Sequence, residues 1–353
     1  MLKSLLQWLI CPVCGHGFKL DVLCSKGDEI TEGKLNCPCD QKFPIIAGVP
    51  RLLCDGLRED LPQLYPEFFN RYSELFNSKW KLAKTDLNQQ KKMTMDRFGF
   101  EWLHFSDYNC DNFKQFIAPL PVDFFKGKLG LDIGCGAGRH AEQASQNGAE
   151  IIGIDLSQAV DAAQQNNIEN KLVHIIQADI YNLPIKPGIF DFVYSLGVLH
   201  HLPEPEKGYR TLIQLLREGG ALFVWLYAFS ARKIALEILR AITRQMSNNN
   251  IRRVAYLCNL LDYGICINLY RLLTALPYVS LTAKKYAPLR IKEYANHGFK
   301  INYTDWFDRL SAPITNYYKE NKMLEWLKHS GLIHTRLLLE GDSWWWLYGE
   351  RNV

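Results

Sequence analysis

Short apolar stretches alternate with amphipathic stretches through the middle of the chain. The apolar stretches predict strands near residues 129–133, 150–155, 172–178, 190–195 and 221–227. The amphipathic stretches predict helices near residues 139–147, 157–169 and 205–217. Strands that alternate with helices are typical of a parallel sheet with helices on both faces. We therefore expect a doubly wound α/β domain in this part of the chain.

The alternation stops after the fifth strand. Residues 230–295 carry apolar side chains at helical spacing, such as Ile234, Ile238 and Ile242, and predict a mostly helical insertion. After it, residues 321–330 predict a last helix that ends at Gly331. The remaining expected elements are two final strands at residues 334–340 and 343–350 and two earlier helices at residues 66–84 and 111–117.

Composition sets limits on this picture. The 353 residues, of which 48% are hydrophobic, can form more than one buried core. The net charge of +4 is small and gives no support for nucleic-acid binding. No apolar run approaches the roughly 20 residues that span a bilayer. Residues 1–10 are not followed by a small-residue cleavage site, so we expect no signal peptide and a cytoplasmic protein.

Three glycines follow the first strand of the α/β region, and an acidic residue ends the second. Gly134, Gly136 and Gly138 stand at alternate positions, and Asp155 follows Gly134 by 21 residues. Glycines suit a sharp turn from strand to helix where a ligand approaches the backbone, and a carboxylate after the second strand can bind a ribose diol. The spacing is tighter than the Gly-x-Gly-x-x-Gly of dinucleotide enzymes. It therefore favours a nucleoside ligand without a pyrophosphate.

The run from Leu131 to His140 resembles motif I of class I S-adenosylmethionine (SAM) dependent methyltransferases, and the resemblance extends over residues 129–227. It implies a Rossmann-like seven-stranded α/β fold with SAM as cofactor. It also implies that Asp155 holds the ribose hydroxyls and that Asp179 binds the adenine amino group. The candidate cofactor-binding residues are Asp132, Gly134, Gly136, Gly138, Asp155, Leu156, Asp179, Ile180 and Ser195.

Two adjacent histidines follow the fourth strand. The run Leu199-His200-His201-Leu202-Pro203 resembles ubiquinone and menaquinone C-methyltransferases and many small-molecule O- and N-methyltransferases. The resemblance implies that one histidine lines the junction of cofactor and acceptor, while the other caps the next helix or bonds within the loop. His200 and His201 are therefore the candidate catalytic residues, and the expected activity is methyl transfer to a small-molecule acceptor. Secondary candidates are His297, Tyr303 and Asp305.

Five of the ten cysteines lie within residues 11–39. Two close pairs, Cys11 with Cys14 and Cys37 with Cys39, are typical of a tetrahedral zinc site. Together with residues 43–53, they resemble the zinc-ribbon activator subunit of tRNA and protein methyltransferases, which implies that these four cysteines are the zinc ligands.

The second pair departs from that family, because only Pro38 separates its cysteines and Asn36 stands where a ligand is expected. Ligation by Cys24, loss of the metal and a redox role for Cys11 and Cys14 remain alternatives. The five expected segments are a zinc-ribbon-like module (1–56), a linker packed on the SAM domain (57–125), the SAM-binding core (126–229), a helical cap insertion (230–300) and the returning chain (301–353).

Three further segments keep more than one interpretation. Residues 95–105 resemble a segment that precedes the SAM domain in a group of ribbon-bearing bacterial methyltransferases, where it either closes the cofactor pocket or packs the linker onto the domain. Residues 344–346 are three consecutive tryptophans, suited to packing at a sheet edge or to an acceptor pocket. The insertion is expected to cap the acceptor pocket, with contact to a membrane surface or to RNA as alternatives. Its basic residues are Arg232, Lys233, Arg240, Arg244, Arg252, Arg253, Lys284, Lys285, Arg290 and Lys292.

Two other functions remain open. A ribbon fused to a SAM domain also resembles bacterial rRNA guanine methyltransferases. Residues 195–198 argue against methylation of RNA. They read Ser-Leu-Gly-Val, whereas nucleic-acid amino methyltransferases carry an acidic or Asn residue before Pro-Pro-aromatic at this place. A non-catalytic SAM-binding scaffold is the third hypothesis. The expected partner is a small-molecule acceptor rather than nucleic acid, weak contact with a membrane surface stays an alternative, and the sequence does not give the oligomeric state.

Overall fold

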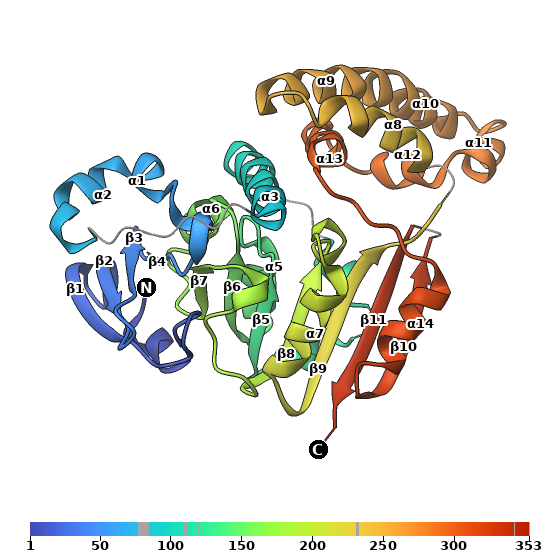
Figure 1. Cartoon of the computed structure of the whole chain (residues 1–353). Helices are drawn as coiled ribbons and strands as arrows, with labels where there is room; N and C mark the ends of the chain where they lie inside the picture. Colours follow the sequence, from blue (N-terminus) through green and yellow to red (C-terminus); the bar gives the residue numbers. More distant parts are fainter. Residues whose placement is uncertain (77–84, 109–111, 119, 231–232, 342, 353) are drawn as a thin grey trace.

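The chain begins with a small antiparallel sheet. The computed structural model describes residues 1–76, 85–108, 112–118, 120–230, 233–341 and 343–352. After a 3-10 turn at Lys3–Gln7, four strands follow in sequence order: β1 (Lys19–Lys26), β2 (Glu29–Asn36), β3 (Lys42–Ile46) and β4 (Val49–Pro50). Leu9 and Phe43 belong to the same hydrophobic core as Ile176 and Ile185 of the α/β domain. The module is therefore packed directly on that domain (Figure 1).

A seven-stranded sheet forms the centre of the molecule, in the order β10-β11-β9-β8-β5-β6-β7. Its strands are β5 (Leu129–Ile133), β6 (Glu150–Asp155), β7 (Val173–Gln177), β8 (Phe190–Leu196), β9 (Leu216–Tyr227), β10 (Leu332–Glu340) and β11 (Trp344–Arg351). The first five pair in parallel, and β11 is antiparallel to both β9 and β10. The order reverses between β5 and β8, which is where ligands bind in sheets of this kind. The predicted fold class is confirmed.

Helices cover both faces of the sheet, as predicted. They are α5 (Arg139–Gln146), α6 (Ala159–Asn166), α7 (Pro205–Leu215) and α14 (Glu320–Lys328). The side chains of α7 and α14 share one core with the N-terminal module, while those of α5 and α6 belong to a second core with the short helix α4 (Phe113–Ile117). The apolar stripe of each helix is therefore buried against the sheet.

The segment before the sheet differs most from the prediction. Its elements are a 3-10 turn at Asp55–Arg58, α1 (Leu61–Leu64), α2 (Pro66–Arg71), a 3-10 turn at Ser73–Leu75, α3 (Asp86–His104), α4 and a 3-10 turn at Val122–Phe125. The helix expected over residues 66–84 was wrong in extent, because α2 ends at Arg71; residues 77–84 and 109–111 lie outside the described part of the chain. The 19-residue helix α3 was not predicted. Thr85 caps it by accepting a hydrogen bond from the backbone N–H of Asn88 (3.2 Å).

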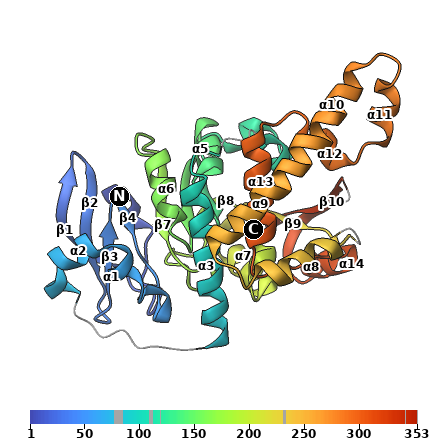
Figure 2. The same ribbon diagram turned by 90° about the horizontal axis from the view of Figure 1, so that it is seen from above.

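The predicted helical insertion forms a cap over one end of the sheet. Its elements are α8 (Lys233–Thr243), α9 (Asn248–Leu261), a π-helical turn (Asp262–Ile267), α10 (Asn268–Ala275), α11 (Ser280–Tyr286), α12 (Leu289–Tyr294) and α13 (Phe299–Ser311). The predicted boundary at residue 300 falls inside α13, so residues 301–311 belong to the cap. In Figures 1 and 2, α3 lies between the N-terminal module and this cap. No helix within the described residues is both long and apolar enough to cross a membrane.

Arg51, immediately after β4, holds the N-terminal module against the α/β domain. Its side chain is completely buried, donates a hydrogen bond to Oε1 of Gln177 (3.1 Å) and forms an ion pair with Asp161 of α6. The hydroxyl of Tyr65 donates to the second carboxylate oxygen of Asp161 (2.6 Å). The backbone N–H of Leu52 donates to the carbonyl of Gln177 (2.8 Å), so the module extends the sheet beyond β7.

Removal of the Arg51 side chain is expected to destabilise the protein substantially. The substitution Arg51→Ala leaves Gln177 and Asp161 without their buried partner, so the free energy of unfolding in urea should fall by about 3 kcal/mol. The control Arg71→Ala removes an exposed ion pair with Glu32 and should leave the unfolding midpoint unchanged. Equal midpoints for the two variants would contradict this role of Arg51.

Candidate active site

A cavity of about 1680 Å³ lies at the carboxyl ends of the parallel strands. Its floor consists of the segments that follow β5, β6, β7, β8 and β9, and its roof of α3, α8, α12 and α13. Seven of the eleven predicted cofactor-binding and catalytic residues line it: Gly134, Gly136, Asp155, Leu156, Asp179, Ile180 and His201. The cavity therefore joins the predicted cofactor site and the cap in one space.

The glycine loop has no room for side chains. Gly134, Gly136 and Gly138 have φ angles of 77°, 52° and 80°, in the left-handed region that glycine adopts without strain. A Cβ atom at Gly134 would lie 2.3 Å from the side chain of Val198. At Gly136 it would lie 3.1 Å from the indole of Trp102 on α3. The loop backbone is thus packed closely against Val198 and Trp102, which both line the cavity.

Asp155 lies at the end of β6 and faces the glycine loop. One carboxylate oxygen accepts hydrogen bonds from the backbone N–H and the hydroxyl of Ser157 (2.8 and 2.7 Å), and the other accepts from the N–H of Gly136 (3.0 Å). Burial raises the pKa of this carboxyl, and the hydrogen bonds from Ser157 and Gly136 counteract the shift. These donors hold the carboxylate in a fixed position on the cavity wall. Ribose binding by Asp155 stays a prediction.

Asp179, after β7, already has two partners. One oxygen accepts a hydrogen bond from the backbone N–H of Tyr181 (3.1 Å), and the other forms a buried ion pair with Lys91 of α3 (2.6 Å). The Lys91 ammonium also lies 4.6 Å from the ring centre of Tyr181. Both carboxylate oxygens are therefore engaged. An adenine amino group that binds Asp179 as predicted has to compete with Lys91.

Three predicted cofactor residues lie behind the cavity wall. Asp132 is 1% exposed within β5, and burial raises the pKa of its carboxyl to about 7. Ser195 is fully buried and donates its hydroxyl hydrogen to the carbonyl of Ile133 (3.1 Å). Gly138 starts α5, where a Cβ atom would lie 2.7 Å from the amide of Asn167. The structure gives these residues a part in shaping the loop, and the predicted direct contact with the cofactor is untested for all three.

The two candidate catalytic histidines occupy different environments. His201 lines the cavity, and its Nδ1 lies 2.7 Å from the carbonyl oxygen of Ile314. Because a carbonyl only accepts, Nδ1 carries the proton and Nε2 is left as a proton acceptor. Burial lowers the pKa of His201, which keeps the ring neutral. His200 is fully buried, and its ring centre lies 3.9 Å from that of Tyr227.

The segment 95–105, for which the sequence left pocket closure or linker packing open, lies almost wholly in α3 and contributes to the cavity wall, although none of its residues was a predicted site residue. Phe98 packs against His201, with ring centres 5.1 Å apart, and Glu101 and Trp102 line the cavity beside it. Glu101 is 1% exposed, and burial, together with the nearby carboxylates of Asp308 and Asp305, raises its pKa well above the ordinary range. A signal was available, because Lys91, Met95, Phe98 and Trp102 recur at helical spacing.

Of the three secondary candidates, two line the cavity and one does not. Asp305 lines the cavity, accepts hydrogen bonds from the hydroxyls of Tyr108 and Tyr294, and has its pKa raised to about 6 by burial. His297 also lines the cavity. Tyr303 points away from it, since its hydroxyl donates to the carbonyl of Arg252 (3.2 Å).

The tryptophan run lies in an inner strand, because β11 pairs with β9 on one side and β10 on the other, so the expected position at a sheet edge was wrong. Trp344 and Trp345 reach the cavity wall, whereas Trp346 is packed in a core. The indole N–H of Trp345 donates to the carbonyl of Tyr318 (2.8 Å), which fixes the ring at the end of the strand. Two of the three rings therefore line the cavity, and a part in an acceptor pocket stays a prediction.

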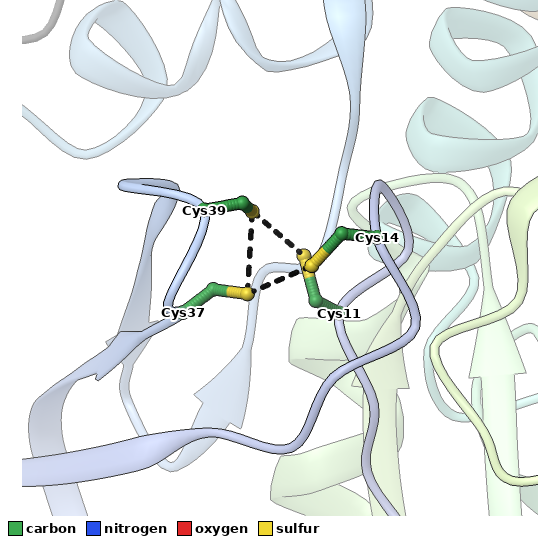
Figure 3. A group of neighbouring side chains, drawn as sticks. All are labelled: Cys11, Cys14, Cys37 and Cys39. Carbon is green, nitrogen blue, oxygen red and sulfur yellow. Dashed lines mark hydrogen bonds between the residues drawn. The ribbon is translucent and has the colours of Figure 1, made fainter.

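The four cysteines predicted as zinc ligands converge in the N-terminal module (Figure 3), and none of them lines this cavity. Their sulfur atoms all lie within 4.8 Å of one another, and Cys14 and Cys37 approach to 3.1 Å. A tetrahedron of sulfurs around zinc has edges of about 3.8 Å, so this set fits the metal. Cys24 is exposed on β1 outside the cluster, and the amide of Asn36 donates to Asp21 (2.9 Å), so neither joins the four sulfurs.

Comparison with known proteins agrees with the resemblance. Residues 131–224 match a family described as methyltransferase domain. The ubiquinone biosynthesis O-methyltransferase of Azoarcus sp. (strain BH72) is 35% identical over 117 residues, which are 30% of this chain and 50% of that protein. The tRNA U34 carboxymethyltransferase of Psychromonas ingrahamii is 36% identical over 127 residues, or 35% and 36% of the two chains.

Among solved structures, an S-adenosylmethionine dependent methyltransferase from Mesorhizobium loti is 26% identical, covers 34% of this chain and 54% of that chain, and has a TM-score of 0.31. The first four curated relatives are matched over 27% to 58% of their own length. The family model covers residues 131–224, which carry the glycine loop. This part of the chain is therefore similar to a methyltransferase domain, and the N-terminal module and the cap lie outside the match.

Loss of the Lys91 ammonium should strengthen nucleoside binding and lower the stability of the protein without ligand. In Lys91→Met, Asp179 regains a free oxygen for the adenine amino group, so the dissociation constant for S-adenosylhomocysteine in isothermal titration should fall about tenfold. Without ligand, the buried carboxylate is unpaired, and the free energy of unfolding should fall by about 3 kcal/mol. The neighbouring Lys92→Met, which removes a half-exposed pair with Glu59, should change neither. An unchanged dissociation constant in Lys91→Met would show that Lys91 does not compete with the ligand.

Proposed function

We propose that this chain is a SAM-dependent methyltransferase that transfers a methyl group to a small-molecule acceptor held beneath the helical cap. The observation that carries the proposal is the continuous cavity between the glycine loop and the cap. Its volume of about 1680 Å³ exceeds the roughly 300–1,000 Å³ of a site for one ligand. Cofactor and acceptor can therefore lie in the same space, as direct transfer between them requires.

The residues on the cavity floor fit SAM. Gly134 and Gly136 let the ligand approach the backbone, Asp155 is held ready for a ribose diol, and Leu156 and Ile180 offer apolar surface for adenine. When bound, SAM supplies an activated methyl group on a sulfonium. The protein's main contribution is to position the acceptor and to exclude water, which α3 does by covering the loop with Trp102.

His201 is the residue best placed to remove a proton from the acceptor. Its hydrogen bond to the carbonyl of Ile314 fixes the ring and the tautomer, so that Nε2 is the basic atom. Tyr227 stacks on His200 and, together with Phe98, flanks His201. His200 thus acts through packing as a positioning residue, and the proton acceptor is His201.

The cysteine cluster is proposed to hold a structural zinc ion in the N-terminal module. Four cysteine sulfurs within 4.8 Å of one another are a donor set that suits zinc. The cluster is outside the cavity, so its part is to stabilise the fold of the module.

The replacement His201→Ala is expected to lower turnover by about 10²–10⁴-fold without changing the affinity for SAM. Because burial lowers the pKa of His201, the wild-type rate should be constant above about pH 6.5 and fall only below it, as the ring takes up a proton. The variant should lack this acidic decline, whereas His334→Ala, at an exposed site on β10, should keep the wild-type profile. A variant with wild-type turnover would remove His201 from the mechanism.

One zinc ion per chain is expected in native mass spectrometry of the purified protein. Removal of the metal with a chelator should expose four additional reactive thiols and lower the thermal midpoint, because the short module loses the ion that joins its loops. Cys14→Ser should bind zinc more weakly, and Cys24→Ser, outside the cluster, should keep full occupancy. A metal-free module with an unchanged midpoint would contradict the zinc assignment.

Transfer of a labelled methyl group tests the proposed activity directly. The protein is incubated with methyl-labelled SAM and a cell extract, and the small-molecule, RNA and protein fractions are separated. Label in the small-molecule fraction, insensitive to ribonuclease and protease and absent with His201→Ala, is the expected result. Label in RNA would replace the proposal by RNA methylation. Tight SAM binding without label in any fraction would replace it by a non-catalytic scaffold.

A further inference from the structure

The far end of the cap exposes a concentration of apolar side chains. Of the 26 large hydrophobic residues exposed in the described part of the chain, 11 lie within residues 257–286. We call this set the cap surface: Leu257, Leu260, Leu261, Ile265, Leu269, Leu272, Leu276, Tyr278, Val279, Leu281 and Tyr286. Single exposed apolar residues are normal on a protein surface, whereas a patch of this kind indicates a binding surface.

The helix that carries most of the cap surface is apolar on two faces. From α9 through the π-helical turn to α10, the buried residues Ile251, Ala255 and Ile267 belong to a face that packs on the protein, with α13 against α9. Exposed Leu and Ile residues recur at intervals of three or four positions from Leu257 to Leu276, which places them along another face. A helix that is apolar on both faces requires a second apolar environment.

The turn before α11 and α11 itself combine apolar, aromatic and basic side chains. Tyr278, Leu281 and Tyr286 are 98%, 79% and 72% exposed. Lys284 and Lys285 stand beside them on α11, which lies at the outer end of the cap in Figures 1 and 2. Tyrosine and lysine place an apolar body at the membrane boundary and a polar end in water. This composition is typical of elements that lie in the interface of a bilayer.

The segment that carries α10, α11 and the start of α12 contains only positive charges. Residues 263–292 contain five Lys or Arg residues and no Asp or Glu. Arg290 is paired with Asp262, and Arg271 binds the carbonyls of Ala295 and His297. Within the described residues, Lys284 and Lys285 have no acidic partner within 4 Å, and both are exposed. The unpaired positive charge is therefore beside the most exposed apolar residues.

From these observations we propose that the cap surface binds an anionic phospholipid bilayer. The apolar side chains enter the boundary between headgroups and acyl chains, and Lys284 and Lys285 contact the phosphate groups. A second copy of this chain fits less well, because a twofold interface brings the same surface against itself and places like charges together. The proposal does not depend on methyl transfer.

Vesicle co-sedimentation with the whole chain tests the proposal. The expected result is binding to vesicles of equimolar phosphatidylcholine and phosphatidylglycerol at low salt, and much weaker binding to phosphatidylcholine alone. Lys284→Gln with Lys285→Gln should weaken binding by about 30-fold, the effect of two basic residues near a charged membrane. Tyr278→Ser with Leu281→Ser should abolish binding that persists at physiological ionic strength. Both pairs are exposed, so the fold and the affinity for SAM should be unchanged.

The matched control is Lys171→Glu with Leu172→Ser, an exposed basic and apolar pair elsewhere on the surface, and it should bind like the wild type. Failure of the wild type to bind anionic vesicles at low salt would overturn the proposal, as would wild-type binding by the cap variants. Light scattering over a range of protein concentrations then tests for dimerisation. A concentration-dependent dimer that the cap variants abolish, with no vesicle binding, would assign the surface to a second copy instead.

Discussion

The buried ion pair between Lys91 and Asp179 joins the 19-residue helix α3 to the edge of the sheet at which the cavity lies. Helix α3 crosses that edge and is held at three places. Lys91 binds Asp179, Trp102 lies against Gly136, and Arg97 donates hydrogen bonds to the carbonyl of Met246 in the cap (2.7 Å). These contacts reach the sheet, the loop and the cap, so α3 links three parts of the cavity wall.

Two buried ion pairs lie where parts of the chain meet. Arg51 with Asp161 joins the N-terminal module to the sheet, and Lys91 with Asp179 joins α3 to it. A buried ion pair contributes little net stability, but the loss of either partner is strongly unfavourable. Such pairs therefore specify how the parts fit together. The apolar cores on both faces of the sheet provide most of the stability.

The sequence predicted local features well and tertiary ones poorly. The five parallel strands and the glycine loop follow from apolar runs and from residues whose backbone needs are local, such as Gly134. The clustering of Cys37 with Cys39 across a single proline agrees with the predicted ligand set, although the family spacing differs. Helix α3 was missed because Lys91 reads as a solvent-facing residue until its partner Asp179 is known. The sequence could not separate His200 from His201, since only the folded cavity, which His201 lines and His200 does not, distinguishes the two rings.

The central claim is that the carboxyl edge of this sheet binds SAM through the glycine loop and Asp155. Isothermal titration of the purified protein with SAM and with S-adenosylhomocysteine, alongside Asp155→Ala, tests it most directly. Micromolar binding that the substitution abolishes is the predicted result, because the ribose hydroxyls lose their acceptor. No binding by the folded wild-type protein would contradict the account of the cavity.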